Sequence, residues 1–99
     1  MRGTPTYLII LDRATAAERN AVQDLVKEHA DGWWHRFTNV WLVGGHSTKY
    51  WRDLITPAIP DGESSILVFK LPANLEPGAD WTYYGIDIDE RLEWLNNNI

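Results

Sequence analysis

The sequence has no cysteine in its 99 residues, which excludes disulfides, thiolate catalysis and cysteine-ligated metals. It also has no long hydrophobic run near its start, since the apolar stretch from Tyr7 to Leu11 is interrupted by Asp12. We therefore expect neither a signal peptide nor a membrane span after Met1-Arg2-Gly3-Thr4-Pro5. The expected protein is a cytoplasmic single domain over residues 1–99, stabilised by packing alone.

Positive charge is scarce, because nine basic residues face 14 acidic ones and the net charge is −5. This sign disfavours a chain that coats RNA or DNA nonspecifically. A local basic surface stays open as an alternative, because Arg13, Arg36, Lys49 and Arg52 can share one side of the fold.

Recognisable metal and nucleotide motifs are also missing. The three histidines, His29, His35 and His46, do not have the spacing of a zinc site, and we expect them to be solvated or structurally bonded. The segment 44–49 lacks the spacing of a phosphate loop, so we interpret it as a glycine connection with a serine cap. An anion cradle is the alternative there.

What is present is an alternation of strand and helix patterns. Residues 6–12 are typical of a buried strand, and Thr15 with Glu18 has the spacing of a capping box that starts a helix. Residues 33–37 and 40–43 predict two strands of a hairpin joined by Thr38-Asn39, and residues 66–71 predict a fourth strand. Between them, Ser47 or Thr48 can cap a helix that Pro57 limits, with an apolar face formed by Trp51, Leu54, Ile55 and Ala58. The order predicts an α+β, ferredoxin-like βαββαβ antiparallel sheet with two helices on one face.

The strands are apolar on both sides, so the second face of this sheet also needs a cover. Residues 72–99 form a C-terminal extension that we expect to pack on the sheet or on a dimer partner. Within it, Trp81 to Tyr84 predict a short extra strand, and Asp87 predicts the cap of a final helix. The acidic group at Asp89 and Glu90 fits that helix start better than a shared cation site.

Six tryptophans are many for this length. Such side chains favour cores and subunit contacts, and the basic partners of a base-stacking surface are few. We expect Trp33, Trp34 and Trp41 to alternate between the sheet faces, and together with Trp81 to contribute to an interface.

Asp12 ends the best strand just before a helix, where α/β proteins often position ligands. One interpretation is an oxygen ligand for Mg²⁺, completed by a second Asp12 across a twofold axis. The other is that Asp12 only ends the strand or pairs with Arg13 or a helix end.

Four stretches resemble the small CRISPR-associated adaptation-complex protein, the related VapD toxins and, more specifically, stand-alone bacterial proteins labelled "SinR family". Tyr7–Asp12, Gly32–Val43 and Asp61–Leu71 carry the general likeness, and Glu93–Asn96 resembles the closing helix of the SinR-labelled proteins. The resemblance implies a homodimer with Asp12 as metal ligand and catalytic residue. It leaves two functions open, a Mg²⁺-dependent nuclease in which Arg13 and Arg36 bind phosphate, and a non-catalytic interaction or regulatory module.

Overall fold

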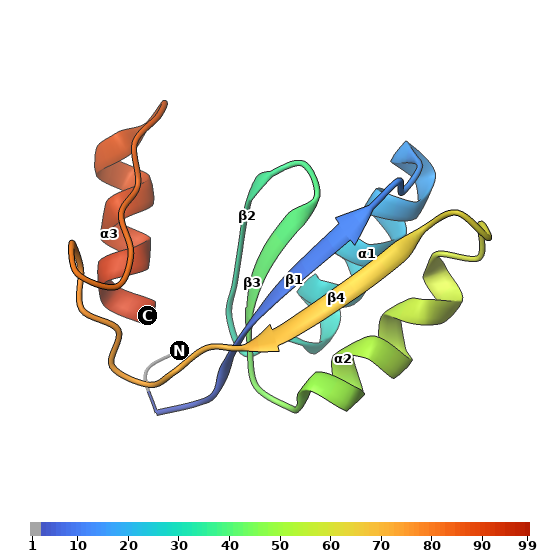
Figure 1. The fold of residues 1–99 in the computed structure, drawn as a ribbon, viewed down its shortest axis with the longest axis horizontal. Helices are drawn as coiled ribbons and strands as arrows, with labels where there is room; N and C mark the ends of the chain where they lie inside the picture. Colours follow the sequence, from blue (N-terminus) through green and yellow to red (C-terminus); the bar gives the residue numbers. More distant parts are fainter. Residues whose placement is uncertain (1–2) are drawn as a thin grey trace.

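The computed structural model describes residues 3–99. Met1 and Arg2, the first two residues of the segment considered above for a signal peptide, lie outside the described residues. The chain folds into a four-stranded antiparallel sheet with three α-helices (Figure 1). This confirms the predicted mixed α+β class. The elements in order are β1 (Thr6–Asp12), α1 (Ala16–His29), β2 (Trp33–Phe37), β3 (Val40–Gly44), α2 (Thr48–Ile55), the 3₁₀ turn η1 (Thr56–Ala58), β4 (Ser65–Lys70) and α3 (Ile88–Asn98).

The strand order in the sheet is β2-β3-β1-β4, and every paired neighbour is antiparallel. The most apolar strand, β1, is central, with Leu8 opposite Leu42 on one side and Phe69 on the other. Strands β2 and β4 are the two edges. Thr38 and Asn39 form the predicted two-residue turn of the β2–β3 hairpin.

The first face of the sheet packs against α1 and α2 and contains the main core. Successive residues of a strand point to opposite faces, so one alternate set from each strand enters this layer. The buried cluster joins strand and helix residues, namely Tyr7, Ile9, Leu11, Val22, Val26, Trp41, Val43, Trp51, Ile55 and Ile59.

Helices α1 and α2 both begin at residues that the sequence predicts as caps. Thr15 Oγ1 accepts a hydrogen bond from the Glu18 N–H at 3.1 Å, and Glu18 Oε1 accepts one from the Thr15 N–H at 2.9 Å, which completes the capping box. Ser47 caps α2 by accepting from the Tyr50 N–H. Helix α2 ends at Ile55, and Pro57 lies in the 3₁₀ turn that follows.

The second face is covered only in part. The C-terminal segment 72–99 crosses to the opposite side of the molecule and places α3 beside the β2 end of the sheet (Figure 1). There Leu95 of α3 packs with Trp34 and Leu42 into a smaller buried cluster. Residues packed against this cluster come from the sheet and from the segment itself, and they are Leu8, Leu71, Trp81, Tyr83, Trp94 and Ile99.

The remainder of the second face is apolar and open. Leu67 and Phe69 of the edge strand β4 are 50% and 54% exposed, and Ile10 of β1 lies directly opposite Leu67. Because Leu67 and Phe69 are two residues apart, both side chains point to the same face. We refer to Ile10, Leu67 and Phe69 as the β4 strip.

Two local predictions in the C-terminal segment are wrong. Residues 81–84 form no strand, because Trp81 makes one isolated bridge to Pro77 and packs into the smaller cluster. Asp87 does occupy the position before α3, but with φ 51° and ψ 40° its side chain makes no capping hydrogen bond. A cap side chain acts from extended backbone, whereas Asp87 is left-handed.

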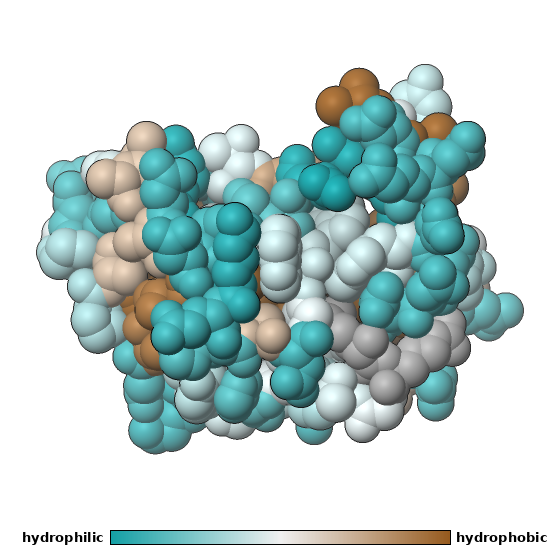
Figure 2. All heavy atoms as spheres, turned by 180° about the vertical axis from the view of Figure 1, so that it is seen from behind, coloured by the Kyte–Doolittle hydropathy of each residue, from teal (hydrophilic) through white to brown (hydrophobic). Residues whose placement is uncertain are grey.

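Outside the β4 strip, much of the surface is polar. Figure 2, which shows the molecule from behind, is dominated by hydrophilic residues with hydrophobic ones in small separate areas. Within residues 3–99, the helices are all too short or too polar to cross a bilayer.

Candidate functional site

Asp12 is the last residue of β1, and its side chain is exposed. Its backbone pairs with Ser65, the first residue of β4. By the alternation along β1, Asp12 points to the same face as Leu8 and Ile10, which is the face that carries the β4 strip. The carboxylate therefore borders the open apolar surface and not the main core.

The two arginines that the sequence assigns to phosphate binding are both paired with acids. Arg13 Nη1 lies 3.4 Å from Glu63 Oε2, and Arg36 Nη2 lies 3.3 Å from Glu90 Oε1 on α3. Exposed pairs of this kind contribute at most about 1 kcal/mol, so an incoming phosphate can replace the acid in either pair. Arg13 follows Asp12 directly, whereas Arg36 lies on β2, with β3 between it and β1.

For a Mg²⁺ ion bound at Asp12, one copy of the chain supplies a single carboxylate ligand. The described residues 3–99 contain no cluster of three or more histidine, aspartate or glutamate side chains with metal-binding geometry. Magnesium in phosphate chemistry is commonly held by one or two carboxylates together with waters and substrate oxygens. The residues thus fit the ion only if a second Asp12 or a bound phosphate completes the set.

The tryptophans alternate between the faces as predicted. Trp33 packs against the main core, with the Lys27 ammonium 6.0 Å from its ring, and Trp34 packs into the smaller cluster on the second face. Trp41 is completely buried in the main core, and its indole N–H donates to Gln23 Oε1 at 2.7 Å. Of the four residues predicted for an interface, Trp33 and Trp81 keep partly exposed surface in one copy of the chain, and Trp41 has none.

The histidines are bonded within the fold, as expected. His35 Nδ1 donates to the Val40 carbonyl, and its ring stacks on Trp41 with centroids 4.0 Å apart. His46 Nε2 hydrogen-bonds the carbonyl of His29, and its ring stacks on Tyr50. Segment 44–49 is a connection tied into the protein by these bonds and by the Ser47 cap.

One buried carboxylate has a role beyond the predicted capping box. Glu18 is 6% exposed and also accepts hydrogen bonds from Ser64 Oγ at 2.8 Å and from the Asp61 N–H at 3.2 Å. The backbone hydrogen bond from Thr15, followed by that from Ser64, holds the pKa of Glu18 below its ordinary value despite the opposing effect of burial. Glu18 therefore joins the start of α1 to the loop before β4.

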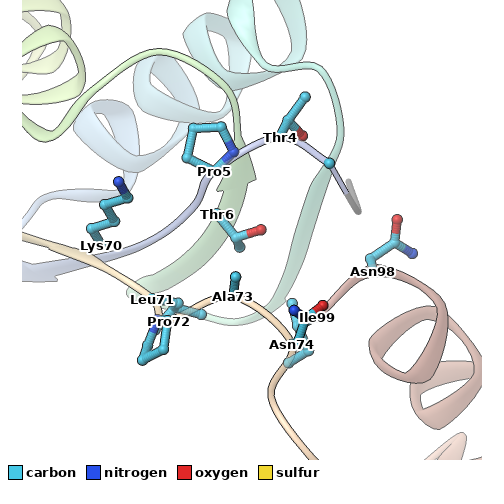
Figure 3. Close-up of a pocket in the computed structure, with 11 residues that line it drawn as sticks. Thr4, Pro5, Thr6, Lys70, Leu71, Pro72, Ala73, Asn74, Asn98 and Ile99 are labelled. Atoms are coloured by element: carbon cyan, nitrogen blue, oxygen red, sulfur yellow. The ribbon is translucent and has the colours of Figure 1, made fainter.

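Two cavities are found beside the sheet, one at the end opposite to Asp12 and one along the second face. One has a volume of about 330 Å³ and lies between the start of β1, the end of β4 and the end of α3 (Figure 3). It is lined by short polar and aliphatic groups such as Thr4, Thr6 and Asn74. The other, of about 260 Å³, lies under the C-terminal segment and is lined mainly by aromatic and aliphatic side chains.

Comparisons of the chain with protein-family models, with curated proteins and with solved structures find no match.

Proposed function

We propose that the chain is a cytoplasmic, non-catalytic interaction module that forms a homodimer through the β4 strip. The observation that carries the proposal is the half-exposed pair Leu67 and Phe69 on an edge strand. Edge strands with flat apolar surface promote pairing with another chain unless charge, proline or a cover protects them. Here α3 covers the β2 side of the same face, and the β4 side is left for a second copy.

The fold we infer for this module is the ferredoxin-like one. Read from the other edge, the strand order is β4-β1-β3-β2, with α1 following β1 and α2 following β3. Two interleaved βαβ units of this kind are what the ferredoxin-like arrangement requires. The C-terminal helix α3 is then an addition that covers part of the face that the two helices leave free.

A second candidate is a Mg²⁺-dependent phosphodiesterase acting on RNA or DNA, favoured by the position of Asp12 on the same face as the β4 strip. If two copies pack face to face, their Asp12 carboxylates lie on facing surfaces and can share one ion. If two copies instead pair edge to edge through antiparallel β4 strands, the two Ser65 residues lie at opposite ends of the six-residue strands, about 17 Å apart. Each Asp12 is paired with Ser65 of its own chain, so the two Asp12 residues are then also far apart. Only face-to-face packing therefore supports a shared metal.

In that second candidate, the bound ion would activate water and stabilise the phosphoryl oxygens. Arg13 is the nearer phosphate ligand, because it adjoins Asp12 in the chain. Arg36 contributes only if phosphate displaces Glu90.

The interface is tested by removing apolar surface from β4 without disturbing the core. We expect the variant Leu67→Ser/Phe69→Ser to sediment as a monomer, because both side chains are half exposed and contribute little to the packing of one copy. The control is Ile86→Ser, which removes one apolar side chain that is 71% exposed but lies outside the strip. A dimer that survives the double substitution, or that Ile86→Ser disrupts, contradicts the proposed interface.

The phosphodiesterase candidate is tested separately with Asp12→Asn, which keeps the size of the side chain and removes its charge. Wild-type protein should cleave single-stranded RNA or DNA in the presence of Mg²⁺ or Mn²⁺, and Asp12→Asn should lose about 10²-fold or more of that rate. Asp61→Asn is the control for the loss of one exposed negative charge. Equal cleavage by wild type and Asp12→Asn, or no cleavage at all, rejects this candidate and leaves the interaction module.

A further inference from the structure

Strand β4 is hydrogen-bonded to a neighbour along one edge only. It is the last strand in the sheet order, and β1 pairs with its inner edge (Figure 1). In an antiparallel ladder, alternate residues bond to the neighbouring strand, and the residues between them point their N–H and C=O groups the other way. The Leu71 N–H donates to the Thr6 carbonyl at 2.8 Å. Counting back by two along the register, Leu67 and Phe69 also belong to the set bonded to β1.

The other alternate set of β4 points its backbone groups outward, and it consists of Ile66, Val68 and Lys70. Among the described residues 3–99, no backbone or side-chain group hydrogen-bonds the N–H or C=O groups of these three residues. The outer edge of β4 therefore offers three donors and three acceptors to an added strand.

A groove of about 380 Å³ lies between α2 and this outer edge. Ile66 and Val68 line it from the face that packs on the main core, and Leu67 lines it from the opposite face. The groove therefore includes the edge of the strand and not only one of its faces. Lys49 and Arg52 of α2 line its other side.

The α2 side of the groove is positively charged, although the net charge of the protein is −5. The two exposed cations share one carboxylate, because Lys49 Nζ lies 2.6 Å from Asp53 Oδ2 and Arg52 Nη2 lies 2.9 Å from Asp53 Oδ1. One carboxylate cannot neutralise two cations, and no acidic side chain of the described residues lines the groove. The groove therefore attracts a ligand with negative charge.

Two simpler occupants match this groove poorly. A second β4 strand, Ser65–Lys70, contains no acidic residue, and it brings another Lys49 and Arg52 with it. A phosphate ligand satisfies the cations, but it has no row of donors for the outward carbonyls. A peptide strand matches both sides if its acidic side chains lie beside α2 and its apolar ones lie beside Leu67 and Phe69. Because side chains alternate along a strand, acidic and apolar residues alternate in such a peptide.

We propose that the outer edge of β4 binds an extended segment of another protein, with alternating acidic and apolar residues, as an added antiparallel strand. Main-chain hydrogen bonds hold the segment, and the side chains beside it give specificity. A peptide residue directly opposite Val68 shares its face, so the acidic residues are the ones whose N–H groups bond to β4. The proposal does not rest on the homodimer, since copies that pack face to face through the β4 strip leave this edge open.

Hydrogen exchange of single amides in the full chain tests the edge directly. The probe is a peptide of about eight alternating glutamate and valine residues with blocked ends, and we expect a dissociation constant of about 0.1 mM. At about ten times that concentration, it should slow exchange of the Ile66, Val68 and Lys70 amides about tenfold. The Leu67 and Phe69 amides, already bonded to β1, should not change. Slow exchange of the outward amides before the peptide is added would mean that a second copy occupies the edge, and would overturn the proposal.

Two methylated peptides separate strand addition from attraction by charge. An N-methyl group on each glutamate removes the donors that face β4, so binding should weaken at least about tenfold. The same groups on the valines face away from β4 and should leave the affinity unchanged. If the two methylated peptides bind equally well, the peptide does not add as an antiparallel strand and the proposal fails.

A substitution in α2 tests the charge of the groove. Lys49→Gln leaves Asp53 to neutralise Arg52, so the peptide should bind about fivefold more weakly at low ionic strength. The matched control is Lys27→Gln, which removes the same charge from α1, where the ammonium lies 6.0 Å from the ring of Trp33 on the other edge strand. This control should bind the peptide as wild type does. Equal weakening by both substitutions would show attraction to overall charge and would contradict a site at the β4 edge.

Discussion

At the scale of single residues, Glu18 shows what a local motif can and cannot reveal. Its spacing from Thr15 predicts the capping box, and the structure confirms it. Its bonds to Ser64 and Asp61 join positions more than forty residues apart, and no pattern within a short window can indicate them. The same limit applies to Asp12, whose exposure on the open face depends on the register of β1 with β4.

The lowered pKa of Glu18 leads to a pH-dependent stability. A carboxyl with a folded-state pKa below its unfolded value stabilises the fold fully above the unfolded pKa, and this contribution is lost as the pH falls through the folded pKa. We expect Glu18→Gln to be less stable than wild type at pH 7, and the difference between the two proteins to shrink progressively below about pH 4.3. Urea unfolding of both proteins at several pH values measures this difference.

The control for that series is Glu63→Gln, which removes an exposed carboxylate from the same region of the fold. Its stability should differ little from that of wild type at any pH. A Glu18→Gln difference that stays constant from pH 7 to pH 3 would show that its carboxylate charge does not stabilise the fold.

At the scale of elements, the sequence predicts structure best where the signal is local. Strand β1, the hairpin turn at Thr38-Asn39 and the caps at Thr15 and Ser47 all depend on neighbouring residues, and all are confirmed. The stretch 81–84 has strand-forming residues but finds no sheet edge to join, because its tryptophan is engaged in packing. In β4 the run Ile66-Leu67-Val68-Phe69 is apolar throughout, so its composition cannot tell that one face of it stays open.

Helix α3 tests how strongly the C-terminal segment is held to the sheet. Leu95 is its one fully buried side chain among the described residues and packs with Trp34 and Leu42. We expect Leu95→Ala to lower the free energy of unfolding by about 2–3 kcal/mol, measured by urea denaturation, since a buried leucine is removed.

Leu92, one turn earlier in α3, is only partly buried and provides the comparison. Leu92→Ala should cost less than about 1 kcal/mol. If both substitutions cost the same small amount, α3 does not pack on the sheet as described, and the aromatic cavity beneath it would lose one of its walls.

At the scale of the whole molecule, the sheet is protected unequally. Helices α1 and α2 pack against one face, and α3 packs on the β2 side of the other. The β4 strip stays partly exposed on that second face, and Asp12 borders it. The interaction module therefore depends on a second copy of the chain, and in the phosphodiesterase candidate a second copy can supply the second carboxylate.

The proposed homodimer is tested most directly by the mass of the wild-type protein in solution, measured by light scattering after size exclusion at micromolar concentration. The chain has a mass of 11.4 kDa, and we expect a particle of twice that mass. A particle with the mass of a single chain across the micromolar range would contradict it.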